Sequence, residues 1–207
     1  MIDYIIEDCE QFSQKDKDEM FNLIAAHKKT GKEHGAKLCE KDVKKNEADN
    51  KIILSNHCVG SKCAIAPKKF AKTICPKDTT EIGTFHTHPK AGYWPSPNDI
   101  ISMLDKGKKL SCIGTDLYSD EEKYKFHRTI DCHEIKNRQL KKLGKELRNA
   151  RDDKRNKIIG SIVDILNKYP DYYIYELLNT KCNMQQSNNP KRYIWNEKTK
   201  RYVETFY

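Results

Sequence analysis

Apolar residues recur at helical spacing near the start of the chain and then at alternate positions. Residues 16–30, KDKDEMFNLIAAHKK, place their apolar side chains on one face of an amphipathic helix, and Gly31 follows as a stop signal. Residues 33–43 and 51–59 are predicted to be strands separated by a polar turn. The proline- and lysine-containing stretch 67–80 is predicted to be a loop.

The next segment, EIGTFHTH at residues 81–88, has the alternation of a strand. A helix is predicted from Ser96 or Pro97 to Lys106, followed by Gly107. Buried strands are predicted at 110–118 and 123–130. In the strand at 81–88, every second side chain points to one face, which gives the set Ile82, Thr84, His86 and His88.

The character of the chain changes after residue 130. Leucines and isoleucines at helical spacing predict two helices, or one long interrupted helix, between residues 133 and 168. Residues 191–207 have the pattern of a hairpin. The expected class is therefore α/β, a sheet covered by helices. We expect one domain at 1–130, followed by a basic helical extension at 131–207 that ends in the hairpin.

Positive charge gathers in that extension. The chain has 207 residues and a formal net charge of +9. Residues 131–207 hold 17 Lys and Arg against 10 Asp and Glu, and residues 136–157 hold ten against three. The segment 136–157 could contact nucleic acid or an acidic partner, and a solvated basic face is the alternative.

Two features bear on the compartment. The acidic N-terminus is unlike a secretory signal, and no apolar run approaches the roughly 20 residues of a membrane helix. We therefore expect a soluble, cytoplasmic protein. The eight cysteines form no C-x-x-C pair. In a reducing cytosol they are expected to be buried free thiols, with a bridge among Cys58, Cys63 or Cys75 left open.

The chemistry-bearing stretch is His86-x-His88-Pro89, which is followed after a short loop by Ser96-x-x-Asp99. Two histidines two residues apart on a strand project to the same side and can reach one metal ion. A carboxylate in the first turn of the following helix can point toward them. Two imidazoles and one carboxylate make the three protein ligands typical of catalytic zinc, with water in the fourth position.

Ser96 permits two interpretations. Ser96-x-x-Asp99 is a helix-capping box, a common structural feature that needs no function. Ser96 is also placed to donate a hydrogen bond to a developing oxyanion. Taken together, in this order and at this spacing, the four polar residues favour a zinc-dependent hydrolase.

The stretch resembles the JAMM motif of the MPN-domain metalloproteases, a family that includes deubiquitinases, a deneddylase and small prokaryotic enzymes. The resemblance spans roughly residues 15–130. It implies a three-layer α/β/α fold like that of cytidine deaminases. It also implies that His86, His88 and Asp99 bind Zn2+, that Ser96 stabilises the tetrahedral intermediate, and that the substrate is a conjugate of ubiquitin or a ubiquitin-like protein.

The resemblance further implies a general-base glutamate on an early strand. The candidates are Glu33, Glu40 and Glu47. Glu33 is preferred because it directly follows the first helix and precedes Gly35 and an apolar strand, as in the family.

The residues exclude one of three alternatives to this function and leave two open. Cytidine deaminases carry H-x-E with a later P-C-x-x-C, which this chain lacks, so deamination is excluded. A peptidase of the same family with a different protein substrate is one alternative. A non-catalytic scaffold of MPN type, or a nucleic-acid-binding protein, is the other.

Overall fold

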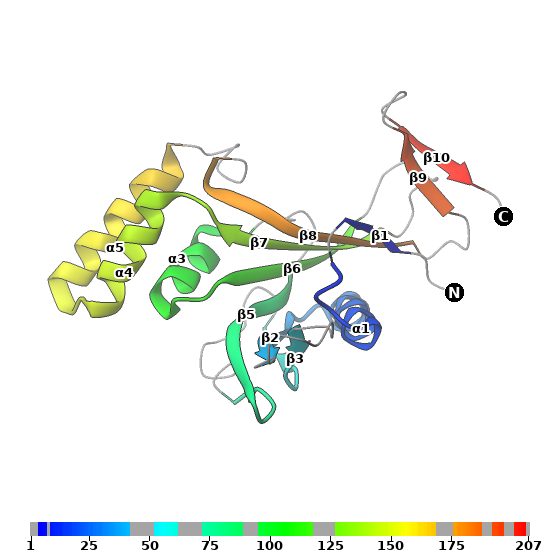
Figure 1. The fold of residues 1–207 in the computed structure, drawn as a ribbon, viewed down its shortest axis with the longest axis horizontal. Helices are drawn as coiled ribbons and strands as arrows, with labels where there is room; N and C mark the ends of the chain where they lie inside the picture. Colours follow the sequence, from blue (N-terminus) through cyan, green and yellow to red (C-terminus); the bar gives the residue numbers. More distant parts are fainter. Residues whose placement is uncertain are drawn as a thin grey trace.

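A computed structural model describes most of the chain: residues 4–7, 9–41, 52–61, 72–88, 95–117, 127–168, 176–187, 192–196 and 201–205. Eight strands form one mixed sheet: β1 (Tyr4–Glu7), β2 (His34–Lys41), β3 (Ile52–Leu54), β4 (Cys58–Val59), β5 (Thr79–His88), β6 (Leu110–Leu117), β7 (His127–Ile135) and β8 (Leu178–Ser187). The described helices are α1 (Gln14–Thr30), α3 (Pro97–Lys106), α4 (Arg138–Asn149) and α5 (Asp152–Asn167). Figure 1 shows their arrangement.

The sheet has the strand order β1-β8-β7-β6-β5-β2-β3, and β4 also pairs with β2. Neighbouring strands are antiparallel except β5 and β6, which run parallel and are connected through α3. The remaining strands, β9 (Arg192–Asn196) and β10 (Arg201–Thr205), form the predicted terminal hairpin. It lies at the end of the molecule opposite α4 and α5 (Figure 1).

The two helices predicted around the candidate site begin and end where their capping residues require. Ser13 caps α1 by accepting a 3.1 Å hydrogen bond from the backbone N–H of Asp16. Both helices end at a glycine in the left-handed region, with φ of 65° at Gly31 and 66° at Gly107. Such backbone angles favour glycine, so the turn after each helix is fixed by the sequence.

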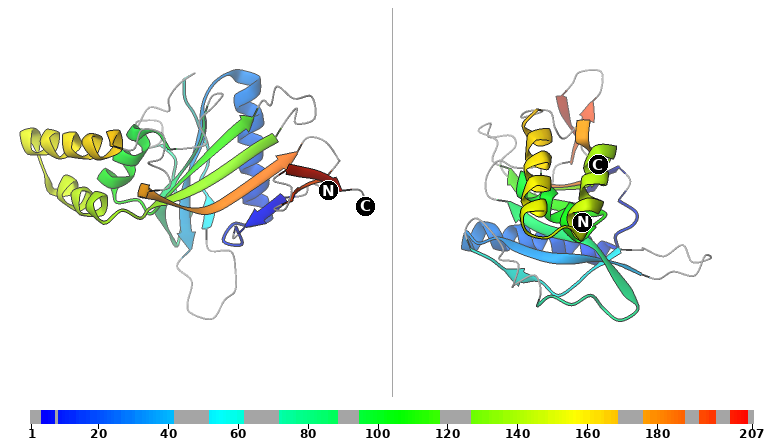
Figure 2. Two further views of the ribbon diagram at one scale, coloured as in Figure 1. Left: turned by 90° about the horizontal axis from the view of Figure 1, so that it is seen from above. Right: turned by 90° about the vertical axis from the view of Figure 1, so that its left-hand side faces the viewer.

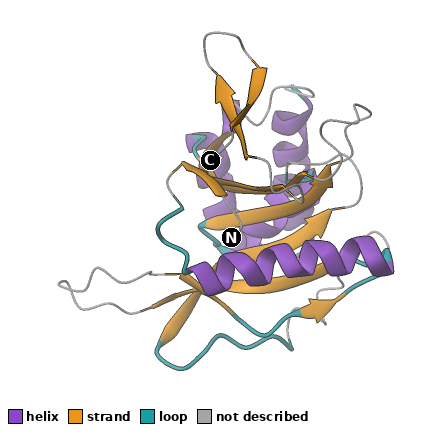
Figure 3. Ribbon diagram, turned by 90° about the vertical axis from the view of Figure 1, so that its right-hand side faces the viewer, coloured by secondary structure: helices purple, strands orange, loops and turns teal. Residues whose placement is uncertain are grey.

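Helix α1 runs along one face of the sheet (Figure 3). Its apolar side chains, including Phe21 and Ile24, join Leu38 of β2 and Phe85 of β5 in one buried core. Gly114 of β6 permits the close approach, because a Cβ there would lie 2.8 Å from atoms of both Ile24 and Phe85. A mixed sheet flanked by helices confirms the expected α/β class.

A second core lies among the other three helices. α3 packs against α4 and α5, and apolar residues of all three helices meet Ile135 of β7 and Leu178 of β8. The three helices lie together at the same end of the sheet in each view (Figures 1 and 2). The helices α4 and α5, which follow residue 133, are thus packed on α3, the helix that begins at the Ser96-x-x-Asp99 segment.

The sheet continues past the boundary expected at residue 130. That position falls inside β7, and β8 from the C-terminal part lies between β7 and β1. Strands β1 and β8 were not expected from the sequence. The C-terminal part therefore contributes one full strand to the main sheet as well as two helices and the hairpin.

The cysteines differ from the expectation of free thiols. Cys75 is bonded to Cys39, whereas Cys63 lies outside the described residues. Strand pairing explains two further bridges, since β1 runs beside β8 and Cys112 lies directly opposite Cys132. The three disulfides are Cys9–Cys182, Cys39–Cys75 and Cys112–Cys132.

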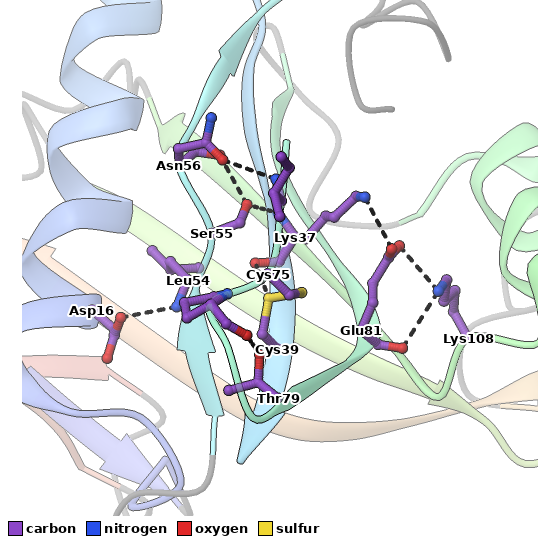
Figure 4. Close-up of a disulfide and its surroundings, with 12 residues drawn as sticks. Asp16, Lys37, Cys39, Leu54, Ser55, Asn56, Cys75, Thr79, Glu81 and Lys108 are labelled. Carbon is purple, nitrogen blue, oxygen red and sulfur yellow. Dashed lines mark hydrogen bonds and ion pairs between the residues drawn. A yellow bond between two sulfur atoms is a disulfide. The ribbon is translucent and has the colours of Figure 1, made fainter. Parts of the chain in front are cut away.

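Figure 4 shows the Cys39–Cys75 bridge and its surroundings. Cys39 pairs with Glu81, whereas Gly35 pairs with His86, so the bridge lies toward the end of β5 away from the two histidines. Close to it, the carboxylate of Glu81 makes ion pairs of 3.1 Å with Lys37 and 3.0 Å with Lys108. These contacts tie β2, β5 and the start of β6 together. In the described part of the chain, no helix has the length and apolar character needed to cross a bilayer.

Candidate metal centre

His86 and His88 lie near the end of β5, between β2 and β6. The register puts His86 beside Ile113 of β6 and directly across from Gly35 of β2. Because side chains alternate along a strand, both imidazoles emerge on the face opposite Thr87. His86 is buried and His88 is half-buried. The two rings are in contact, which confirms the prediction that both histidines lie on one face of the strand.

Asp99 reaches the same place from the first turn of α3. The predicted capping box is present: the Ser96 hydroxyl accepts from the Asp99 N–H at 3.2 Å, and the Asp99 Oδ2 atom accepts from the Ser96 N–H at 2.7 Å. This reciprocal pair fixes the carboxylate relative to the helix terminus. Pro89 and residues 90–94, which join the two halves of the motif, lie outside the described residues.

The three side chains bring their ligand atoms together. The Nε2 atoms of His86 and His88 are 3.0 Å apart. The Oδ1 atom of Asp99 is 3.2 Å from Nε2 of His86, and its Oδ2 atom is 3.5 Å from Nε2 of His88. Ligand atoms on a tetrahedral zinc ion, each about 2.1 Å from the metal, lie about 3.4 Å from one another. The three observed distances, two of which involve different oxygens of Asp99, are close to this value, and one ligand atom from each residue can be chosen so that all three lie within 4.8 Å of one another.

Within the part of the chain that the structure describes, this is the one group of His, Cys, Asp and Glu side chains close enough to share a metal ion. The donor set of two imidazoles and one carboxylate suits zinc and leaves a fourth tetrahedral position for a non-protein ligand. The residues present therefore fit a metal ion of this kind.

The electrostatics of the site also favour a cation. Burial acts to raise the pKa of Asp99, but the two imidazoles and the Ser96 hydrogen bond hold it well below its usual range. Burial acts to lower the pKa of His86, whereas the charges of Asp99 and Glu33 raise it above its ordinary value. The site thus holds an ionised carboxylate and lies close enough to Glu33 to feel its charge, and a bound cation would interact favourably with both.

Glu33 lies beside this group. It is buried, with 5% of its surface exposed, and its charge is close enough to raise the pKa of His86. It precedes Gly35 by two residues, so its side chain shares the face on which His86 emerges. Its backbone is held on one side by bonds of 2.7 and 2.8 Å to Gly60 and Ser61.

The other glutamate candidates are elsewhere. Glu40 lies opposite Thr80, six residues before His86 on β5 and so roughly 20 Å away along the strand. There it pairs with Lys109 at 2.9 Å on the surface. Glu47 lies outside the described residues. Of the described candidates, only Glu33 has a charge that acts on a member of the histidine–aspartate group.

Ser96 is close to the group, but its hydroxyl is already engaged. It donates to the Asp99 Oδ2 atom at 2.6 Å while accepting from the Asp99 N–H. An oxyanion could receive this hydrogen only after the hydroxyl rotated away from the carboxylate. The capping role is observed, and the oxyanion role stays a prediction.

Two buried polar residues, Thr87 of β5 and His27 of α1, meet on the face of the sheet opposite the two histidines, and neither was singled out from the sequence. Thr87 lies between the two histidines, and its hydroxyl is 2.9 Å from the Nδ1 atom of His27 in α1. The only signal in the sequence was the polar residue between two candidate ligands. A hydroxyl at that position is ordinary in a strand, and its partner is 60 residues away.

Comparisons with known proteins add little to this geometry. No described protein family and no curated protein matches the chain. Among solved structures, the chain is similar to a JAB1/MPN domain protein from Archaeoglobus fulgidus, with 20% identity, over 57% of this chain and 81% of that one. The TM-score of 0.29 is too low for this likeness to support an argument.

Proposed function

We propose that the protein is a zinc-dependent metallopeptidase or isopeptidase that hydrolyses an amide bond. One observation carries the proposal: His86, His88 and Asp99 hold their ligand atoms within 4.8 Å of one another, with the buried Glu33 beside them. Three ligands of this kind with one open position are typical of catalytic zinc sites, whereas structural zinc sites usually have four protein ligands.

In this proposal, three residues bind the metal ion and Glu33 transfers a proton. Zinc bound by His86, His88 and Asp99 would supply a Lewis acid that lowers the pKa of a water molecule and polarises the amide carbonyl. Glu33 accepts the proton of the attacking water and delivers it to the leaving amine. Its burial near His86 supports this role, because a general base must lie within hydrogen-bond reach of the proton it removes.

The substrate class is the finer part of the proposal. The resemblance of His86-x-His88-Pro89 and Ser96-x-x-Asp99 to the JAMM motif favours an isopeptide bond to ubiquitin or a ubiquitin-like protein. A peptidase acting on another protein is the alternative within the class. A non-catalytic scaffold is disfavoured, because a complete ligand set and a buried carboxylate serve no purpose in a protein that only binds.

The test is incubation of the purified, zinc-loaded chain with a panel of ubiquitin-like conjugates, ubiquitin-like precursors and unrelated peptides. We expect cleavage of at least one substrate, its loss with a chelator, and its return when zinc is restored. Cleavage confined to unrelated peptides would reassign the substrate within the class. Failure to cleave any substrate, by protein that holds zinc, would favour the scaffold.

A second activity is supported by α4. Arg138, Lys141, Lys142 and Lys145 are exposed on the side of the helix away from its buried residues Leu140, Gly144 and Leu147. Four cations at this spacing form a basic stripe that suits nucleic acid or an acidic protein. Binding of labelled DNA, RNA and heparin should weaken steeply with salt and in the variant K141E/K142E. Salt-independent binding, or none, would leave the stripe as a solvated face.

A further inference from the structure

The backbone on both sides of Glu33 is tied to the strand that carries the metal ligands. Thr87 is fully buried on β5 between His86 and His88, and its hydroxyl faces α1. The backbone N–H of His34, the residue after Glu33, donates to the Thr87 Oγ1 atom at 2.9 Å. The residue after the candidate base is therefore held by the residue between the candidate ligands.

The same hydroxyl holds a second group. The Oγ1 atom of Thr87 is 2.9 Å from the Nδ1 atom of His27 on α1. Because this oxygen accepts from His34, its own hydrogen is available to donate to an unprotonated Nδ1. Burial lowers the pKa of His27, which keeps the imidazole neutral and able to accept.

His27 completes the connection on the other side of Glu33. Its side chain hydrogen-bonds the backbone of Lys32, the residue before Glu33, in a contact that raises the pKa of His27. A bond that favours the protonated ring is one in which the ring donates, here to the carbonyl group. The backbone carbonyl of His27 also accepts from Gly31 at 2.7 Å, at the turn that leads from α1 toward Glu33.

We propose that Thr87 and His27 are positioning residues that hold Glu33 at a fixed distance from the metal ligands, through the backbone of Lys32 and His34. This inference rests on the proposed function. Neither side chain belongs to the group of His86, His88 and Asp99 that could hold a metal ion. A hydroxyl and an imidazole at this buried contact fix direction and distance, which an apolar pair packed there would not do.

The experiment compares four variants of the full-length, zinc-loaded protein. Thr87→Val removes the hydroxyl at nearly constant volume, and Thr87→Ser retains it. His27→Phe removes the ring nitrogens from the other side of the contact. Thr84→Val is the matched control, the same chemical change on the same strand at a residue outside the network.

For Thr87→Val and His27→Phe we expect kcat to fall about 10- to 100-fold while KM stays within about threefold, since misplacement of a catalytic group by about 1 Å costs this much. Thr87→Ser should recover most of the rate, and Thr84→Val should keep it. In a Glu33→Gln background, Thr87→Val should cause no further loss, because both changes act through one group.

Two measurements do not depend on turnover. The zinc affinity of Thr87→Val should stay within about threefold of the parent, because all three ligands remain. The amide proton of His34 should exchange with solvent at least about tenfold faster in Thr87→Val than in Thr87→Ser, because only serine preserves its acceptor.

An active parent protein whose Thr87→Val and His27→Phe variants keep full kcat overturns this inference and leaves the proposed function intact. If Thr87→Val lowers kcat by the same factor in the parent and in the Glu33→Gln variant, the inference is also overturned, because Thr87 then has a general structural role. If Thr87→Val fails to fold, the kcat and KM of His27→Phe decide. A parent protein that holds zinc but cleaves nothing in the panel overturns the proposed function, and this inference with it.

Discussion

Gly144 of α4 lies directly against Leu104 of α3, so closely that a Cβ atom on the glycine would come within 2.8 Å of the leucine Cδ2 atom. Two further contacts join α3 to α4 and to α5. Arg148 donates to the backbone carbonyl of Leu104 at 2.8 Å, and Arg155 makes two hydrogen bonds of 2.8 and 2.9 Å to the carboxylate of Asp105. The C-terminal helices thus hold α3, whose first turn carries the metal-ligand candidate Asp99.

This packing predicts opposite outcomes for two glycine-to-alanine changes in neighbouring helices. A Cβ at Gly160 of α5 meets nothing within 4 Å, so Gly160→Ala should stabilise the protein by about 0.5–1 kcal/mol through helix propensity. Gly144→Ala must displace Leu104 and should be less stable than Gly160→Ala by about 1–2 kcal/mol. Denaturant unfolding of both variants provides the comparison, and equal stabilities would show that α4 does not pack tightly on α3.

Asp131 makes stability depend on pH. It is buried on β7, where burial raises its pKa from 3.8 to about 6 despite a hydrogen bond from Asn183. The folded protein then binds a proton more tightly than the unfolded chain, so stability is lost as pH rises from about 4 to about 6. Above that range the ionised carboxylate remains a constant cost.

Asp131→Asn should therefore stabilise the protein at pH 7.5 by about 1–3 kcal/mol, at about 1.4 kcal/mol per unit of pKa. The asparagine keeps an oxygen that can accept from Asn183. The gain should shrink toward zero at pH 4.5, where Asp131 is protonated in the parent. Unfolding free energies of parent and variant at both pH values are the measurement, and a gain that does not change with pH would contradict the assignment.

Six of the eight cysteines should resist alkylation. When unfolded without reductant, the protein should expose thiols at no more than two positions, whereas reduced protein should react at all eight. Reduction should also lower the unfolding temperature, most of all through Cys9–Cys182, which closes a loop of 173 residues. Mass spectrometry of alkylated samples counts the thiols, and eight reactive thiols in unreduced protein would contradict the pairing.

The disulfides also bear on where the protein works. Such bonds form and persist in oxidising compartments and are rare in the cytosol. Three of them are unusual for the cytoplasm expected from the sequence, and that location stays a prediction. The thiol count in protein taken directly from its natural source, trapped at the moment of lysis, distinguishes the two locations.

The parts of the fold that local sequence determines were predictable. Ser96 and Gly107 mark the two ends of α3, and Gly31 marks the end of α1, because caps and left-handed turns depend on neighbouring residues alone. The shared face of His86 and His88 follows from the alternation of a strand. These short-range features were enough to bring the candidate ligands to attention.

What depends on pairing between distant segments could not be predicted. β8, with the polar sequence LNTKCNMQQS, becomes a strand because β7 and β1 flank it, and its own pattern gives little sign of this. The partner of Cys9 is 173 residues away. Glu33 was preferred over Glu40 from the sequence, but the separation of Glu40 from the two histidines needed the register of β2 on β5, which includes an irregularity between Leu38 and Cys39.

That register leads to a direct comparison of the two glutamates. Glu33→Gln should retain zinc but lose about 10²- to 10⁴-fold in kcat, the usual contribution of a general base. Glu40→Gln removes a surface ion pair with Lys109 and should keep both zinc and activity. Steady-state kinetics on any cleaved substrate make the comparison. An inactive Glu40→Gln beside an active Glu33→Gln would mean that Glu33 is not the base.

The central claim is that His86, His88 and Asp99 bind one zinc ion. The most direct measurement is the zinc content of the purified protein after dialysis against metal-free buffer, compared with that of His88→Ala. We predict about one zinc per chain in the parent and almost none in the variant, because two remaining ligands rarely hold a catalytic zinc ion. A folded His88→Ala protein with full zinc occupancy, or a folded parent that takes up no zinc, would contradict the account.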